Sequence, residues 1–230
     1  PIQVNFIGYP GTMGTGCIDY LIADEILIPE QFRNFYIEKI AYLPNCYQPN
    51  CRNREISSKP ICRSDFGLPE DRVVFSSFNN NYKITPEVFA SWMRILKAVE
   101  GSVLWLFSSN LTAEDNLRQH AEENGIDPKR IVFAQKLPVD EHLSRIPLAD
   151  LMLDTFPYGA HTTCSDALRT RFPVVTLKDA YGVALGTGNT TGARAISATS
   201  SNGADTLSVN SVTSSNGTAT FTGFNIVGTI

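Results

Sequence analysis

Apolar and polar positions alternate along residues 71–179 in the way expected of strands and helices that follow one another. Short apolar runs, rich in β-branched and aromatic residues, occur at RVVFSSF (72–78), SVLWLFSS (102–109), IVFAQ (131–135), LMLDTF (151–156) and PVVTLK (173–178). Apolar strands separated by helices are typical of a parallel sheet that is covered on both faces. The pattern therefore predicts an α/β fold, and in such sheets ligands bind at the carboxyl ends of the strands.

Four helices are predicted between these strands, at 86–99, 113–124, 140–149 and 163–170. Pro86 suits the first turn of the first helix, and Pro147 interrupts the third. Thr112 is the predicted N-cap of the second helix, which Gly125 closes. Arg171 follows the fourth helix at a C′ position that favours glycine, so we expect backbone strain there or a different helix ending.

Residues 1–70 have a less regular pattern. A strand at 2–8 leads into a glycine-rich turn, followed by a helix-like apolar stretch at 18–22 and a further apolar stretch at 38–44. Residues 45–69 are polar and rich in turn formers, which favours a segment that crosses between lobes. Because the sequence opens inside a predicted strand, we expect further chain upstream.

The composition changes from Tyr181 onward. The last 50 residues contain only two charged side chains, Arg194 and Asp205, and are dominated by Thr, Ser, Gly, Asn and Ala. The strand-like runs on either side of Ser215-Asn216-Gly217 predict a β-hairpin. Two interpretations fit this bias, a disordered or loosely β tail and a segment grafted from an unrelated β-rich surface protein.

Composition and charge exclude several classes of function. Hydrophobic residues make up 43% of the chain, enough for a core, and the net charge is −4. This balance shows no basic face for nucleic acid or for an anionic membrane, so neither is expected as a partner. The sequence shows no signal peptide and no apolar run long enough to span a bilayer, and we therefore expect a cytoplasmic protein.

The cysteines give no sign of a disulfide framework or a metal site. Their number is odd and they form no C-x-x-C pair: Cys17, Cys46, Cys51, Cys62 and Cys164. This pattern favours reduced thiols. Cys46, Cys51 and Cys62 lie close together, but their spacing fits no standard zinc pattern and no nearby histidine completes one. No metal is therefore expected.

The strongest candidate for a chemical site lies between a predicted strand and a predicted helix, at Gly159-Ala160-His161-Thr162-Thr163-Cys164-Ser165-Asp166. A helix N-terminus after a strand presents free N–H groups and the positive end of the helix dipole, which favour a pyrophosphate. Thr162 and Thr163 add hydroxyl donors. His161 can donate to an anionic oxygen, and Asp166 can accept from ribose hydroxyls. An ordinary helix with Thr162 or Thr163 as its N-cap accounts for the same residues.

Two further segments follow predicted strands. In Asn79-Asn80-Asn81-Tyr82-Lys83, the lysine can neutralise a phosphate, and a solvated loop with a surface lysine is the alternative. In Gly8-Tyr9-Pro10-Gly11-Thr12-Met13-Gly14, closely spaced glycines let a ligand approach the backbone. This turn matches neither G-x-G-x-x-G nor a Walker A loop. His142, in the third predicted helix, can cap, pack or line a base pocket.

Eight segments occur in a fixed order along the chain: GYPGTMG, IDYLIAD, EKIAYLP, GLPED, FNNNYKITPEVF, SVLWL, LPVDEHLSR and ADLMLDTFPYGAHTTCSDAL. In this order they resemble the catalytic region of bacterial relatives of the O-linked N-acetylglucosamine (O-GlcNAc) transferases, a group that includes the SPINDLY proteins. The resemblance covers residues 1–168, and the combination of NNNYKI with HTTxxDAL is specific.

The resemblance implies a truncated fragment of a GT-B-type fold with a Rossmann-like parallel sheet. Residues 1–70 would be a remnant of the N-terminal catalytic lobe with the crossover, and 71–179 the lobe that binds the nucleotide-sugar. Residues 180–230 would be a β-rich or disordered tail unrelated to the family. The rest of the N-terminal lobe and tetratricopeptide repeats are expected upstream.

The resemblance also implies a reaction. A sugar passes from UDP-GlcNAc, or from GDP-fucose in the SPINDLY branch, to a Ser or Thr hydroxyl of a protein, with inversion and without a metal or other cofactor. Lys83 and His161 would be catalytic, because they offset charge on the departing diphosphate. The donor-binding residues would be Asn80, Lys83, His142, Arg145, His161, Thr162, Thr163 and Asp166, with Gly8, Pro10, Gly11 and Thr12 on the acceptor side.

The alternative is a catalytically inactive module that binds at most a nucleotide. The resemblance implies that the histidine-bearing first half of the N-terminal lobe is missing here, and binding without a positioned nucleophile and base gives little rate.

Overall fold

The computed structural model describes residues 1–51 and 53–178, together with five short strands between residues 195 and 227. The chain divides into two compact units, Pro1–Asn53 and Arg54–Ile230. Each unit has its own parallel sheet. Over the described residues, no helix combines the length and the apolar character that crossing a membrane requires.

The predicted boundary at residue 70 differs from this division, because residues 54–70 pack on the second unit. Arg63 donates through Nε to the carbonyl oxygen of Leu148 at 2.8 Å and forms an ion pair with Asp150 at 2.9 Å. Leu68 is buried in the core of the second unit. The assignment of lobes remains a prediction.

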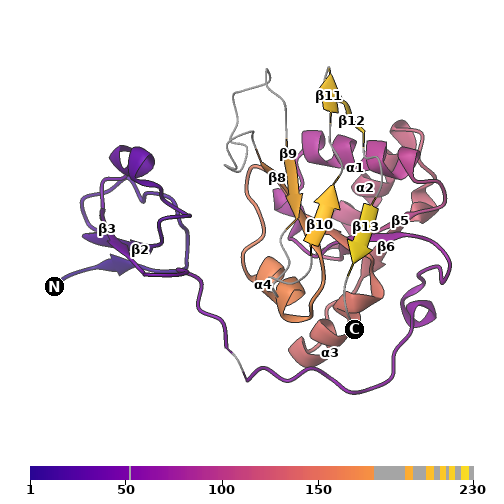
Figure 1. The fold of residues 1–230 in the computed structure, drawn as a ribbon, viewed down its shortest axis with the longest axis horizontal. Coiled ribbons are helices and arrows are strands. Elements are labelled where there is room, and N and C mark those ends of the chain that lie inside the picture. Colours follow the sequence, from indigo (N-terminus) through magenta and orange to yellow (C-terminus); the bar gives the residue numbers. More distant parts are fainter. Residues whose placement is uncertain are drawn as a thin grey trace. The chain divides into compact units, whose positions relative to one another are not determined.

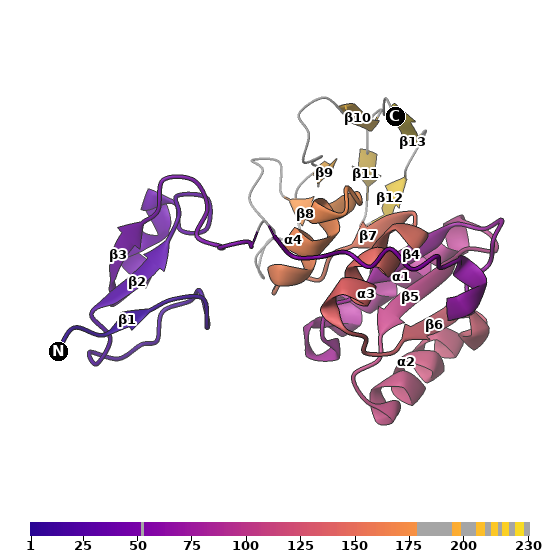
Figure 2. The ribbon, with the colours of Figure 1, turned by 90° about the horizontal axis from the view of Figure 1, so that it is seen from below.

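The second unit is built around a six-stranded sheet in the order β6-β5-β4-β7-β8-β9, which Figures 1 and 2 show from two directions. Its strands are β4 (Val74–Ser77), β5 (Val103–Phe107), β6 (Ile131–Ala134), β7 (Leu151–Leu153), β8 (Val174–Lys178) and β9 (Ala195–Ala198). Neighbouring strands are parallel except β8 and β9. The predicted α/β fold is confirmed. The strand order reverses between β4 and β7, and ligands bind at such reversals in open parallel sheets.

Four α-helices connect these strands, as predicted: α1 (Pro86–Ala98), α2 (Leu111–Glu123), α3 (Val139–Arg145) and α4 (Thr162–Arg169). The predicted N-cap of α2 is wrong, because Asn110 rather than Thr112 accepts from a helical amide, the N–H of Ala113, at 2.8 Å. Gly125 closes this helix with φ of 70°. Pro147 lies beyond the end of α3, where the chain continues as a short 3-10 helix. The 3-10 helices of this unit are η2 (Arg63–Phe66), η3 (Asn81–Lys83), η4 (Pro128–Arg130) and η5 (Ile146–Leu148).

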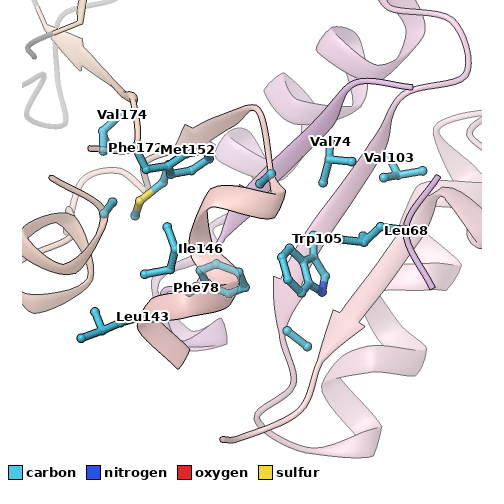
Figure 3. Close-up of a cluster of buried hydrophobic side chains, with 13 residues drawn as sticks. Leu68, Val74, Phe78, Val103, Trp105, Leu143, Ile146, Met152, Phe172 and Val174 are labelled. Carbon is cyan, nitrogen blue, oxygen red and sulfur yellow. The ribbon is translucent and has the colours of Figure 1, made fainter. Parts of the chain in front are cut away.

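Two buried clusters, one on each face of the sheet, form the core of this unit. Neighbouring residues of a strand point to opposite faces, so Leu104 packs in the cluster under α1 and α2 while Trp105 packs in the cluster under α3 and α4. Figure 3 shows the second cluster, in which the rings of Phe78 and Trp105 meet edge to face with centroids 5.1 Å apart. The cluster reaches the carboxyl ends of β4 and β5 through Phe78, which directly follows β4, and Phe107, the last residue of β5.

Arg171 adopts φ of 58° directly after α4, which confirms the backbone strain predicted for that position. A residue with a Cβ in the left-handed region costs about 1–2 kcal/mol. Glycine removes this cost, but its larger conformational freedom in the unfolded chain offsets part of the gain. We expect Arg171→Gly to raise the free energy of unfolding by about 0.5–1 kcal/mol, as measured by urea unfolding. Arg171→Ala keeps the Cβ and should give no gain, so equal stability of the two variants would contradict the explanation.

The first unit contains a small parallel sheet in the order β1-β2-β3. Its elements are β1 (Val4–Asn5), β2 (Tyr20–Ala23), η1 (Glu30–Phe35) and β3 (Lys39–Tyr42). The helix-like interpretation of residues 18–22 is wrong, because this stretch leads into β2. Leu21 and Ala23 of that strand are buried against Ile28 and Ile40. A run of four apolar residues is too short for its period to distinguish a strand from a helix.

The described parts of residues 180–230 are strands, and the choice between a β-rich and a disordered tail stays a prediction. They form the antiparallel pairs β10 (Thr206–Val209) with β13 (Phe224–Val227) and β11 (Thr213–Ser215) with β12 (Thr218–Thr220). The register pairs Ser215 with Thr218. This pairing confirms the predicted hairpin, whose two turn residues lie outside the described residues.

Candidate functional site

A polar network joins the carboxyl ends of β4 and β7. Asn79 is buried and donates through Nδ2 to the Thr155 hydroxyl at 2.9 Å and to Asp154 Oδ1 at 3.3 Å. Asp154 Oδ1 also accepts from the backbone N–H groups of Thr155 and Ala160, each at 2.7 Å. The Thr163 hydroxyl of α4 donates to Asn79 Oδ1 at 2.7 Å. Both strand ends and the start of α4 are therefore held as one hydrogen-bonded unit.

Lys83 reaches the loop that precedes α4. Its Nζ donates to the carbonyl oxygen of Gly159 at 3.0 Å and lies 4.3 Å from the centroid of the Tyr158 ring. Burial lowers the pKa of Lys83 below its ordinary value, and the charge of Asp154 opposes that shift. Lys83 is thus partly buried and fastened, rather than the solvated surface lysine of the alternative interpretation.

The N-terminus of α4 differs in detail from the prediction. His161 is the N-cap rather than Thr162 or Thr163, and its side chain makes no capping hydrogen bond. The two threonines occupy the first helical positions, where backbone N–H groups have no partner within the helix and the helix dipole is positive. The ring centroids of Tyr158 and His161 lie 5.3 Å apart. Burial, and after it the charge of Lys83, lowers the pKa of His161. This helix end is suited to an anion.

A cavity of about 240 Å³ lies beside β4, α3 and α4. It is lined by Arg54, Phe78, Asn80, Phe107, Lys136, Leu137, Val139, His142, Arg145 and Asp166. The structure therefore brings together four predicted donor-binding residues: Asn80 after β4, His142 and Arg145 of α3, and Asp166 of α4. Three cationic side chains and one carboxylate line the cavity with two aromatic rings, a combination that suits an anionic ligand carrying a planar ring. The volume is below the range of about 300–1,000 Å³ that is usual for small-molecule pockets, so the cavity would hold part of a ligand that extends beyond it.

Arg145 and His142 form a buried pair in the wall of this cavity. Arg145 is 1% exposed and donates through Nη1 to the carbonyl oxygen of Gln135 at 2.6 Å and through Nε to His142 Nδ1 at 3.1 Å. Its guanidinium lies 5.4 Å from the Phe78 ring centroid and 5.8 Å from that of Trp105. Burial lowers the pKa of Arg145 to about 10. Because a guanidinium only donates, Nδ1 of His142 carries the lone pair and Nε2 carries the proton.

The pH dependence of stability should report on His142. Burial, followed by the charge of Arg145, lowers its pKa from 6.5 to about 4. Between these values the unfolded chain binds a proton that the folded chain does not, so stability falls as the pH falls through this window. We expect a loss of about 2 kcal/mol from this group between pH 7 and pH 5. Urea unfolding at pH 7 and pH 5 should show a loss of stability that is smaller by this amount in His142→Gln than in the wild type. An equal loss of stability in the two proteins would contradict the assignment.

The residues predicted for the acceptor side belong to the first unit. There the Tyr36 hydroxyl donates to the carbonyl oxygen of Pro10 at 3.3 Å, and the Thr12 hydroxyl donates to the buried Glu38 at 2.7 Å. These bonds fix the glycine-rich turn against the residues that precede β3. The acceptor-side role of Gly8, Pro10, Gly11 and Thr12 remains a prediction.

The remaining groups that could take part in chemistry at this site are the cysteines and any metal ligands. Among the residues that the structure describes, no group of three His, Cys, Asp or Glu side chains is placed to hold a metal ion. Cys17, Cys46, Cys62 and Cys164 are free thiols. Burial, followed by the charge of Asp154, raises the pKa of Cys164 to about 11, so this thiol beside the site stays neutral at pH 7.

A family model described as glycosyl transferase family 41 matches residues 1–53 and 49–214. The second match continues past the change in composition near residue 180. The origin of residues 180–230 outside the family therefore stays a prediction.

Two plant proteins and one solved structure illustrate the similarity. The chain is 42% identical over 183 residues to the probable UDP-N-acetylglucosamine–peptide N-acetylglucosaminyltransferase SEC of Arabidopsis thaliana, covering 77% of this chain and 19% of that protein. It is 35% identical over 185 residues to the correspondingly named SPINDLY of Solanum lycopersicum, with the same coverage of 77% and 19%. A mutant of the Thermobaculum terrenum O-GlcNAc transferase superposes with a TM-score of 0.63 at 28% identity, covering 76% of this chain and 33% of that one. The chain thus spans about a fifth of the length of these curated relatives.

Proposed function

Because the chain belongs to glycosyl transferase family 41, we propose that it is the nucleotide-sugar-binding part of a protein O-glycosyltransferase. The proposed reaction moves GlcNAc from UDP-GlcNAc to a Ser or Thr hydroxyl of a protein. The acceptor oxygen bonds to the anomeric carbon opposite the diphosphate, and the bond between the sugar and the diphosphate breaks. The diphosphate leaves with the electron pair, the hydroxyl proton passes to solvent water and the anomeric configuration inverts.

The convergence of Lys83 and the N-terminus of α4 at the carboxyl ends of β4 and β7 carries this proposal. Negative charge grows on the diphosphate as it departs, and a fixed ammonium and a helix dipole stabilise that charge without reorganisation. Lys83 and His161 are therefore the proposed catalytic residues. With this charge supplied by the protein, the proposed reaction needs no metal.

The adjoining cavity is the proposed place for the nucleoside of the donor. Asn80, His142, Arg145 and Asp166 would contact the nucleoside there. The names of the SEC and SPINDLY relatives specify UDP-N-acetylglucosamine.

Calorimetric titration of UDP and GDP into the purified chain tests the donor site. We expect UDP to bind at least about tenfold more tightly than GDP, a difference of about 1.4 kcal/mol. Tighter binding of GDP would identify GDP-fucose as the better candidate donor. Binding of neither nucleotide would contradict the proposed site.

A nucleotide-binding module without transferase activity is the second candidate, because the acceptor-side residues belong to a separate compact unit. Incubation with UDP-GlcNAc and a Ser/Thr-rich peptide separates the two candidates. A peptide mass increase of one N-acetylhexosamine supports transfer. UDP binding with no mass increase supports the module.

A further inference from the structure

Residues 54–59, which we call the strap, are fastened to the helix that forms one wall of the cavity. The backbone N–H of Ser57 donates to the carbonyl oxygen of Asp140 at 3.1 Å. The ammonium of Lys59 pairs with the carboxylate of Glu141 at 2.7 Å. Both acceptors belong to α3, so the strap follows this helix beside the candidate site.

The first residue of the strap is held at the cavity by α4. Arg169 donates through Nη2 to the carbonyl oxygen of Arg54 at 2.5 Å. The Arg54 guanidinium in turn donates through Nη1 to Asp166 Oδ1, also at 2.5 Å. These side chains are 26% and 9% exposed, respectively, and both line the cavity. A charge-assisted hydrogen bond of this length between partly buried groups fixes the orientation of the carboxylate.

We infer that Arg54 is a positioning residue, which holds Asp166 so that the carboxylate can accept from the ribose hydroxyls of the donor. The inference rests on the proposed function. A carboxylate has two oxygens that each accept more than one hydrogen bond, so the contact with Arg54 leaves acceptor capacity for a ribose. Arg54 also offsets the cost of burying the Asp166 charge before the ligand arrives.

The effect of replacing Arg54 on nucleotide binding should depend on the ribose hydroxyls. A general loss of positive charge would weaken ribose and deoxyribose nucleotides equally. Wild-type protein should bind UDP about tenfold more tightly than 2′-deoxy-UDP, because the missing hydroxyl leaves Asp166 without that partner. Arg54→Ala should weaken UDP binding about tenfold and reduce the preference over 2′-deoxy-UDP to about twofold or less. Arg54→Lys, which keeps the charge but not the planar fork, should retain part of the preference.

Lys59→Ala is the matched control, because it removes a cation from the same strap at an exposed ion pair. It should leave both affinities within about twofold of wild type. Calorimetric titration of UDP and 2′-deoxy-UDP into the four proteins measures the two ratios, and circular dichroism shows that each is folded. If Arg54→Ala does not fold, the ratio in Arg54→Lys decides.

The outcomes separate this inference from the proposed function. If Arg54→Ala binds both nucleotides more weakly by the same factor, Arg54 contributes only its positive charge, and the positioning role is overturned. Unchanged or tighter UDP binding in that variant would also overturn it. Wild-type binding of UDP without any preference over 2′-deoxy-UDP would overturn the inference and leave the proposed function standing. Absence of UDP binding by wild type would overturn both.

Discussion

Replacing Lys83 by alanine is expected to weaken UDP binding by about 10- to 100-fold, with little change in the affinity for uridine. A charge-assisted hydrogen bond contributes about 1.5–3 kcal/mol, and Lys83 holds its ammonium beside the carbonyl of Gly159, just before α4. The nucleoside would occupy the cavity, which Lys83 does not line. The diphosphate should therefore lose its cation while the contacts to base and ribose remain.

Calorimetric titration of UDP and uridine into both proteins measures this difference. Lys97→Ala is the matched control, since it removes an exposed lysine from the end of α1 and should bind both ligands as wild type does. Burial lowers the pKa of Lys83, so its charge is lost at a lower pH than that of a surface lysine, and UDP affinity should fall as the pH rises toward that value. Wild-type affinity for UDP in Lys83→Ala would remove Lys83 from the site.

The elements of the second unit could be predicted because their patterns extend over enough residues to show a period. The apolar positions of α1 recur over thirteen residues and five of them are buried. Helix starts were harder, because several residue types cap equally well. Asn110 and Thr112 both suit an N-cap, and only the backbone geometry selects Asn110. The same limit applies to α4, where His161 is the N-cap although its side chain makes no capping hydrogen bond.

The candidate site could be predicted where a residue lies in the segment that connects the end of a strand to the next helix. Asn80, Lys83 and His161 are of this kind, because the carboxyl ends of neighbouring parallel strands meet at one edge of the sheet. A residue whose role depends on a partner far away in the sequence cannot be recognised from its position after a strand. Arg54 lies 112 residues before Asp166 in the sequence, in a segment that reads as a polar crossover.

Phe78 and Phe107 were missed for a different reason. Their apolar pattern predicts buried strands, and both do pack with the core. They also line the cavity, because each lies at the carboxyl end of its strand, where the core meets the site. The alternation of residues along a strand assigns a face, but it does not show where along that face the core ends.

Replacing Trp105 by alanine is expected to lower the free energy of unfolding of the second unit by about 3–5 kcal/mol. Trp105 is fully buried and contacts the rings of Phe66 and Phe78 at centroid distances of 5.4 Å and 5.1 Å. Alanine would leave a cavity in the cluster shown in Figure 3. Arg145 would also lose one of its two aromatic neighbours, so UDP binding should weaken as the cavity wall loosens.

Trp105→Phe is the informative control, because it separates the volume of the ring from its polar group. The indole N–H is buried and has no hydrogen-bond partner among the described residues, and an unsatisfied buried donor costs about 1–3 kcal/mol. Phenylalanine removes that donor but loses part of the packing, so the two effects oppose each other and the net change should stay within about 1 kcal/mol. Urea unfolding followed by far-UV circular dichroism measures both variants. Equal losses in Trp105→Ala and Trp105→Phe would contradict this explanation, because they would mean that a packed phenyl ring adds nothing to stability over a methyl group at this position.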